Sequence, residues 1–129
     1  MSTLIEDGSR PVYAARRLNG SEPAMEFLES LDEQRDRPRV LRVLGKLARG
    51  QRLSREDFLK LDGDIFELKD YQNRILCFST HRGWHLTHGF TKKTKARTPS
   101  REIQKANEIR REALSRLNSQ QSAGVRKKE

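Results

Sequence analysis

The chain has 129 residues, of which 33% are hydrophobic and 35% charged, and this composition fits one domain with a modest core. It contains no run of 18 apolar residues, which excludes a membrane-spanning helix of ordinary composition. Its first residues also lack the basic start and apolar centre of a signal peptide. The sole cysteine, Cys77, cannot form an internal disulfide, and we expect a cytoplasmic protein.

The net charge of +9 is concentrated in the last third of the chain. Residues 92–129 carry 12 Lys and Arg against 4 Asp and Glu, whereas residues 1–91 carry 15 against 14. Such a field attracts polyanions and makes their binding sensitive to salt. The charge therefore indicates a nucleic acid partner or an acidic protein partner, and does not distinguish between them.

The first half of the chain predicts one strand and two helices. Residues 10–18 form a plausible strand that ends at an Asn-Gly turn. Ser21 is the expected N-cap of a helix with Pro23 in its first turn. A second helix ends near Gly50, the expected C-cap. The two apolar stripes that define these helices consist of Ala24, Phe27, Leu28 and Leu31, and of Val40, Leu41, Leu44, Leu47 and Ala48.

The second half predicts three strands and a final helix. The strands cover residues 65–69, 74–80 and 84–91 and are joined by connections of hairpin length, which favours an antiparallel meander. A helix opens at Thr98-Pro99 and runs to about Leu117, and residues 118–129 form a basic, disordered tail. We therefore predict one α+β domain over residues 1–117. Its order is β-α-α-β-β-β-α, with the two N-terminal helices packed on a small antiparallel sheet and a C-terminal helix.

Two kinds of catalytic centre are unfavourable in this pattern. His85 and His88 have opposite parity in their strand, so without a bulge they point to opposite faces and cannot share a metal ion. Cys77 lies between apolar residues in mid-strand, where burial is the usual outcome. We expect neither a metal nor another cofactor.

Cations occupy positions in or beside these strands that usually carry hydrophobic residues. They are Lys69, Arg74, Lys92 and Lys93, and a sheet with helices on one face leaves the other face open to a ligand. RNA cleavage by attack of a ribose 2′-OH needs a base, an acid, and cations that stabilise the charged phosphorane. Arg suits the phosphate, and Lys or His can transfer protons. Ordinary surface ion pairing is the alternative explanation of each cation.

Several segments, in this order and spacing, resemble the HigB-like, phage-derived branch of the RelE/ParE toxin superfamily. They are the helix at residues 24–31, Phe66-Glu67-Leu68-Lys69, Arg74-Ile75-Leu76, His88-Gly89-Phe90-Thr91-Lys92-Lys93-Thr94 and Thr98-Pro99 with Glu102, Ile103 and Ala106. The resemblance covers roughly residues 10–117. It implies a RelE-like fold and a toxin of a type II toxin–antitoxin system that acts as a metal-independent endoribonuclease. Such toxins cut mRNA on the ribosome and thereby inhibit translation. The implied partner is a helix-turn-helix antitoxin that binds operator DNA.

By position, the resemblance implies that Arg74 contacts the scissile phosphate and that Lys69 stands where the family more often has Arg. Lys92 and Lys93 match its basic pair after the last strand, and His88 is a weaker candidate for acid or base. We expect Lys95 and Arg97 to extend the RNA-binding surface. The alternatives are a non-catalytic RNA-, ribosome- or antitoxin-binding domain on the same scaffold, or a phage- or plasmid-derived protein that binds a protein partner. Which group is base and which is acid stays open.

Overall fold

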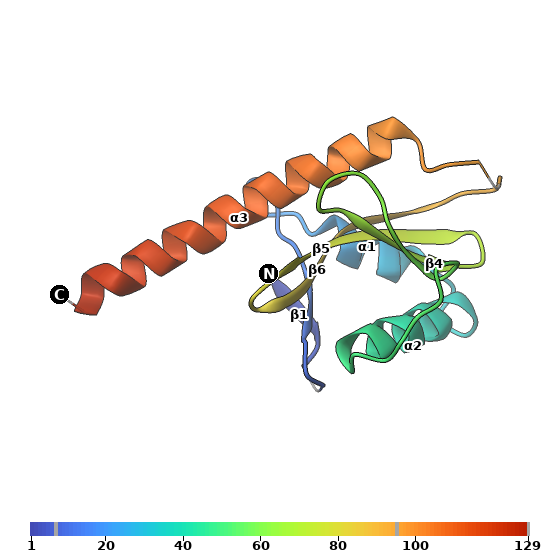
Figure 1. Ribbon diagram of the computed structural model, residues 1–129, viewed down its shortest axis with the longest axis horizontal. Helices are drawn as coiled ribbons and strands as arrows, with labels where there is room; N and C mark the ends of the chain where they lie inside the picture. The colour runs from blue at the N-terminus through green and yellow to red at the C-terminus, as the bar shows by residue number, and fades with distance from the viewer. Residues whose placement is uncertain (7, 95, 129) are drawn as a thin grey trace.

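The computed structural model describes residues 1–6, 8–94 and 96–128, with side chains described up to residue 119 (Figure 1). Its six strands form one sheet in the order β1-β2-β6-β5-β4-β3. The elements are β1 (Ser2–Ile5), β2 (Val12–Ala14), α1 (Pro23–Ser30), α2 (Asp36–Ala48), β3 (Phe58–Lys60), β4 (Phe66–Asp70), β5 (Asn73–Thr80), β6 (Gly83–Thr91) and α3 (Ser100–Lys128). The fold is therefore α+β, as predicted.

The central strands β4, β5 and β6 form the predicted antiparallel meander. The sheet as a whole is mixed, however, because β2 pairs with β6 in parallel. Two strands were not predicted. β1 pairs with β2, and β3, which lies between α2 and β4 in the chain, pairs with β4.

Both predicted helices are present, and each predicted capping residue lies one position away from the observed cap. α1 begins at Pro23, and its N-cap is Glu22, without a side-chain cap bond, instead of Ser21. α2 ends close to the predicted position, but its C-cap is Arg49; Gly50 follows with a φ of +69°, and its N–H donates to the carbonyl of Leu47 at 3.1 Å. Positive φ is readily accessible to glycine and closes many helices in this way.

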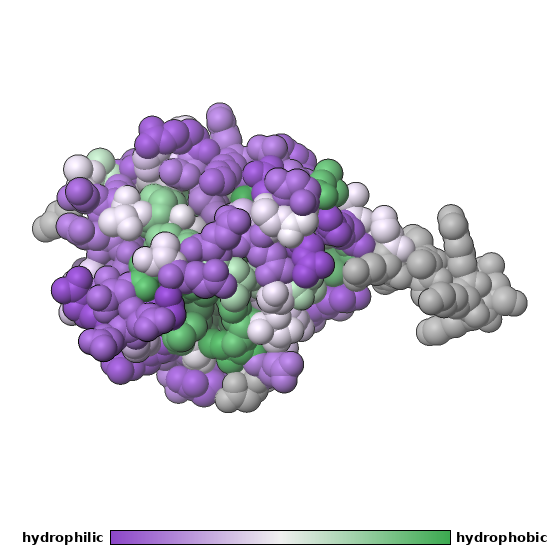
Figure 2. Space-filling view, turned by 180° about the vertical axis from the view of Figure 1, so that it is seen from behind, coloured by the Kyte–Doolittle hydropathy of each residue, from purple (hydrophilic) through white to green (hydrophobic). Residues whose placement is uncertain are grey.

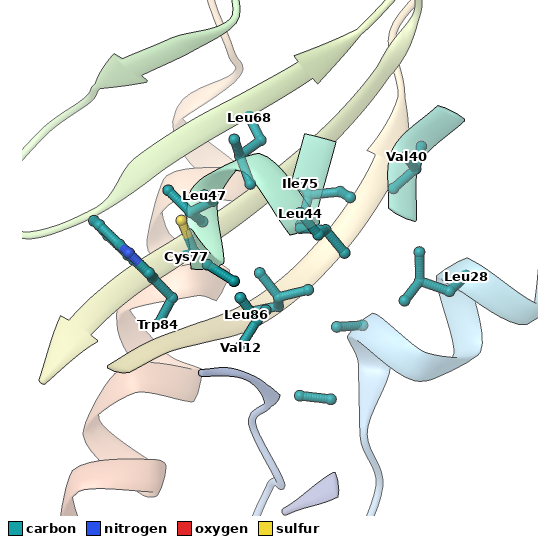
Figure 3. Packing of buried hydrophobic residues seen from close by; sticks show 13 residues of the cluster. Val12, Leu28, Val40, Leu44, Leu47, Leu68, Ile75, Cys77, Trp84 and Leu86 are labelled. Carbon is teal, nitrogen blue, oxygen red and sulfur yellow. The ribbon is translucent and has the colours of Figure 1, made fainter. Parts of the chain in front are cut away.

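α1 and α2 pack on one face of the sheet, as predicted (Figure 3). The core between them and the strands includes Leu44 of α2 and Leu86 of β6, which are fully buried. Cys77 lies in the same cluster, also fully buried. Burial raises the pKa of its thiol, so the structure supports a packing role for this residue.

α3 lies on the opposite face of the sheet (Figure 1). It buries Ala106 and Ile109 against Leu76 and Phe78 of β5. The expectation of an open sheet face is therefore wrong over this area, because a helix with its own apolar stripe covers it. α3 also continues to Lys128, where the sequence predicted disorder beyond residue 117; the proposed end of the domain at residue 117 stays a prediction.

Polar side chains dominate the surface, as Figure 2 shows for one face, where they surround a band of hydrophobic residues. This is consistent with the high charged fraction of the chain. Within the described residues, no helix is both long enough and apolar enough to cross a membrane.

Candidate nucleic-acid interface

The predicted cations Lys69 and Arg74 meet at the end of the β4–β5 hairpin. They are directly opposite each other in the strand register, so their side chains leave the same face. Arg74 is also opposite Phe90 of β6, which belongs to the hydrophobic cluster beneath α3. Lys92 follows the end of β6, and its backbone N–H donates to the carbonyl of Gln72 in the hairpin turn at 2.7 Å. The fold thus brings Lys92, from the end of β6, to the two cations of the β4–β5 hairpin.

A buried carboxylate, that of Glu67, lies beside Lys69. Glu67 of β4 is 2% exposed, and its Oε2 lies 3.9 Å from the Nζ of Lys69. The hydroxyl of Thr98 donates a hydrogen bond to its Oε1. A buried charge requires partners of this kind to offset lost hydration. Sequence analysis did not assign a functional role to Glu67, although its parity already placed it on the face of Lys69.

Arg74 is held by the backbone of the hairpin. Its guanidinium Nη1 donates to the carbonyl oxygens of Tyr71 at 2.5 Å and Asn73 at 3.0 Å. The residue is only 9% exposed, and its Nε is buried without a hydrogen-bond partner. Arg74 therefore fixes the turn and also retains an N–H that is not used by the protein.

The surroundings of Lys92 change its protonation equilibrium. Its pKa is lowered by partial burial and by the nearby cations Arg74 and Lys69, while Glu67 acts in the opposite direction. An amine with a lowered pKa loses its proton more easily and is better suited to proton transfer than an ordinary lysine.

The other predicted cations lie outside the group formed by Lys69, Arg74 and Lys92. Lys93 and Arg97 are exposed in the segment between β6 and α3, so their side chains face solvent. Lys95 lies outside the described residues. The roles of all three in RNA binding stay predictions.

His88 lies in the interface between the sheet and α3. It is 2% exposed; its Nε2 is 3.0 Å from Oε1 of Glu102, and its Nδ1 is 3.2 Å from the hydroxyl of Thr87. Burial lowers the pKa of His88, while the hydrogen bond to Glu102 opposes this effect. With both ring nitrogens engaged, the residue anchors the start of α3; its role as acid or base stays a prediction.

The prediction that His85 and His88 point to opposite faces of the sheet is wrong, because β6 contains a bulge. The register shifts between Leu76 and Cys77, so that His88 is opposite Leu76 while Leu86 is opposite Cys77. Thr87 is thus the extra residue of a β-bulge, and both His85 and His88 face α3. Even so, no group of three His, Cys, Asp or Glu suited to a metal ion occurs in the part of the chain that the structure describes.

Comparison with known proteins supports the resemblance at family level. A family profile described as phage derived protein Gp49-like (DUF891) matches residues 26–111, from α1 into α3. No significant match was found among curated proteins. The narrower assignment to the HigB-like branch stays a prediction. Because the match covers two thirds of the chain, the protein belongs to the Gp49-like family, a family of RelE/toxin-like proteins.

Proposed function

We propose that the protein is the toxin of a toxin–antitoxin pair and that it cleaves RNA at the cluster formed by Lys69, Arg74 and Lys92. The observation that carries this proposal is the grouping of these three cations beside one carboxylate, Glu67, which lies 3.9 Å from Lys69 and attracts Lys92. Glu67 neutralises one positive charge, which leaves an excess of two at a margin of the sheet. Like charges held together in this way cost stability and are typical of sites that bind an anion. Family membership supports the toxin assignment.

In the proposed reaction, the cluster binds the scissile phosphate of an RNA strand. A base removes the proton of the adjacent 2′-OH, whose oxygen attacks phosphorus, and the bond to the 5′-oxygen breaks. An acid protonates that oxygen, so the products carry a 2′,3′-cyclic phosphate and a 5′-OH. Arg74 and Lys69 stabilise the charge on the phosphorane. Lys92, with its lowered pKa, is the best candidate for proton transfer.

Metal ions have no assigned step in this reaction, because the cations of the chain supply the charge stabilisation. Glu67 acts as a positioning residue that holds Lys69, and it attracts Lys92. In the full proposal the substrate is mRNA on the ribosome, and a helix-turn-helix antitoxin neutralises the toxin and carries it to operator DNA. A small helix-turn-helix gene beside the gene of this protein would agree with that arrangement.

RNA binding without cleavage is the second candidate, and the position of His88 favours it. The ring is buried and hydrogen-bonded on both nitrogens, so the usual proton shuttle of ribonucleases is not presented to a substrate. A domain of this kind would grip the RNA backbone and block translation without producing new RNA ends.

Induced expression in bacteria separates these possibilities. The wild-type protein is expected to arrest growth and to generate new mRNA 5′ ends, detected by primer extension. Lys92→Gln and Lys69→Gln each remove one cluster charge and are expected to lose both effects. Lys46→Gln removes an equal charge from the exposed last turn of α2 and serves as the matched control. Circular dichroism verifies that each variant is folded.

Three outcomes would count against the proposal. A wild-type protein that is harmless on induction would contradict the toxin assignment. Growth arrest without new 5′ ends would favour the second candidate. Equal loss of activity in the control and in the cluster variants would show that overall charge matters and that the cluster does not.

A further inference from the structure

A hollow lies beside the tip of the β4–β5 hairpin, on the side of the sheet that carries α1 and α2. Its volume is about 690 Å³, which is within the usual range for sites that bind small organic groups. Its walls include Arg35, Asp36 and Arg39 from the α1–α2 region, Tyr71 and Gln72 from the turn between β4 and β5, and Thr91 from β6. The hollow is thus polar and contains one aromatic ring.

That ring belongs to Tyr71, the first residue of the two-residue turn between β4 and β5. Tyr71 is 78% exposed and has a φ of +55°, the only positive φ outside glycine in the described residues. A side chain with a Cβ adopts this region at an energetic cost, and turns usually place glycine there. The ring contributes little to the hydrophobic core, so core packing does not account for a tyrosine at this position.

Arg39 supports one face of the ring. Its guanidinium carbon lies 4.4 Å from the ring centroid of Tyr71. Arg39 is itself fixed by Asp36 at 2.6 Å and by Asp70 at 3.3 Å. These two carboxylates offset its charge, so this part of the hollow suits an uncharged aromatic group better than a phosphate. The high exposure of Tyr71 leaves the rest of its ring available for stacking.

The turn connects this ring directly to the cation cluster. Arg74 donates to the carbonyl of Tyr71 at 2.5 Å, and the N–H of Lys92 donates to the carbonyl of Gln72 at 2.7 Å. An RNA strand whose phosphate is held by Arg74 and Lys92 therefore passes the hairpin tip. Unstacked bases of single-stranded RNA commonly stack on exposed aromatic side chains.

We propose that Tyr71, supported by Arg39, stacks an unpaired base of the RNA next to the phosphate bound at the cation cluster. This inference rests on the proposed function and adds a base-binding subsite to it. Stacking on a ring tolerates every base, so the subsite positions the strand and orders the nucleotide beside the scissile bond. The strained β4–β5 turn then holds the Tyr71 ring at the hairpin tip, where the RNA strand passes from one face of the β-sheet to the other.

Binding of a short 2′-O-methyl RNA, which cannot be cleaved by 2′-OH attack, tests this subsite. The wild type is compared with two variants. Tyr71→Phe keeps the aromatic ring, whereas Tyr71→Asn removes the ring and places a residue there that tolerates positive φ. We expect Tyr71→Asn to weaken binding about ten-fold and Tyr71→Phe to stay within about two-fold of the wild type. The salt dependence of binding should be unchanged in both, because no phosphate contact is lost. Thermal unfolding confirms that each variant is folded.

A fluorescent base, 2-aminopurine, placed at successive positions of the RNA locates the stacked nucleotide. Its emission should be quenched at one position by the wild type and by Tyr71→Phe, and not by Tyr71→Asn. The stacking inference would be overturned if Tyr71→Asn bound the RNA as tightly as the wild type while Lys92→Gln bound it more weakly. That result would still support RNA binding at the cation cluster. Loss of affinity without quenching at any position would also overturn it. A wild-type protein that binds no RNA would instead refute the proposed function itself.

Discussion

Gly89, in the His-Gly-Phe segment of β6, is the residue whose substitution the structure constrains most sharply. A Cβ at this position would lie 2.2 Å from Cδ2 and 2.5 Å from Cγ of Phe27 in α1. Carbon atoms prefer a separation of about 3.5–4.0 Å, so the ring has to move. Such overpacking usually costs about 1–3 kcal/mol. Gly89→Ala is therefore expected to lower the free energy of unfolding by that amount, and the melting temperature by about 3–5 °C per kcal/mol.

Urea unfolding in a double-mutant cycle tests the cause of this loss. If the ring of Phe27 is the obstacle, Gly89→Ala should cost little when Phe27→Ala is already present, which gives a coupling energy of about 1–2 kcal/mol. Gly45→Ala in α2 is the control, because the added Cβ would approach only the movable side chain of Arg49. The control should be neutral or slightly stabilising. An unchanged stability of Gly89→Ala, or the same loss with and without the ring, would refute the reasoning.

Three further predictions concern buried or partly buried groups. Burial lowers the pKa of His85 from 6.5 to about 4, so the unfolded state binds the proton more tightly. Stability should therefore fall as the pH drops from 6.5 towards 4, and His85→Phe should reduce this slope, measured by urea unfolding at each pH, by up to about 1.4 kcal/mol per pH unit. The buried Cys77 should react with a thiol reagent only as fast as the protein unfolds, and rapid labelling of the native protein would disprove its burial. Arg17 donates two hydrogen bonds to Glu112 of α3, at 2.7 and 3.2 Å; Glu112→Gln should lower the unfolding free energy by about 1 kcal/mol, and no change would show that this pair does not fasten α3.

The sequence predicted the bounds of the longest strands best, whereas the strand expected over residues 10–18 is reduced to β2, Val12–Ala14. β5 and β6 have eight and nine residues, and their alternation is readable within the chain. β3 has three residues, which is too short for a period of two to show. β2 lies beside β6, a strand about 70 residues away, and no local pattern indicates a partner at that distance or its parallel direction.

The candidate site was predicted in part, because hairpin register is a local property. Lys69 and Arg74 flank a short turn, so their pairing across the hairpin follows from the sequence. The bulge at Thr87 reverses the expected parity of His85 relative to His88, and only the strand pairing shows it. The final helix was predicted, but the face of the sheet that it covers was not, because the sequence does not fix the direction of the chain after Lys92.

Glu67 and Tyr71 show what residue-by-residue interpretation omits. Glu67 has the appearance of an ordinary surface partner for Lys69, and its importance comes from its burial beside Lys69 and from its attraction of Lys92. Tyr71 has the appearance of a turn residue, and its backbone conformation and contact with Arg39 distinguish it. Both observations depend on side chains brought together from different elements.

The chemistry of the RNA ends tests the central claim most directly. Ribosomes carrying a defined mRNA are incubated with the wild-type protein in a buffer that contains Mg²⁺ and no EDTA. The 3′ ends of the mRNA fragments are then analysed. We predict a 2′,3′-cyclic phosphate at the cut, its loss when the 2′-OH at that nucleotide is replaced by hydrogen, and its loss in Lys92→Gln but not in Lys46→Gln. Intact mRNA, or cleavage that persists in Lys92→Gln, would contradict the assignment of catalysis to the cation cluster.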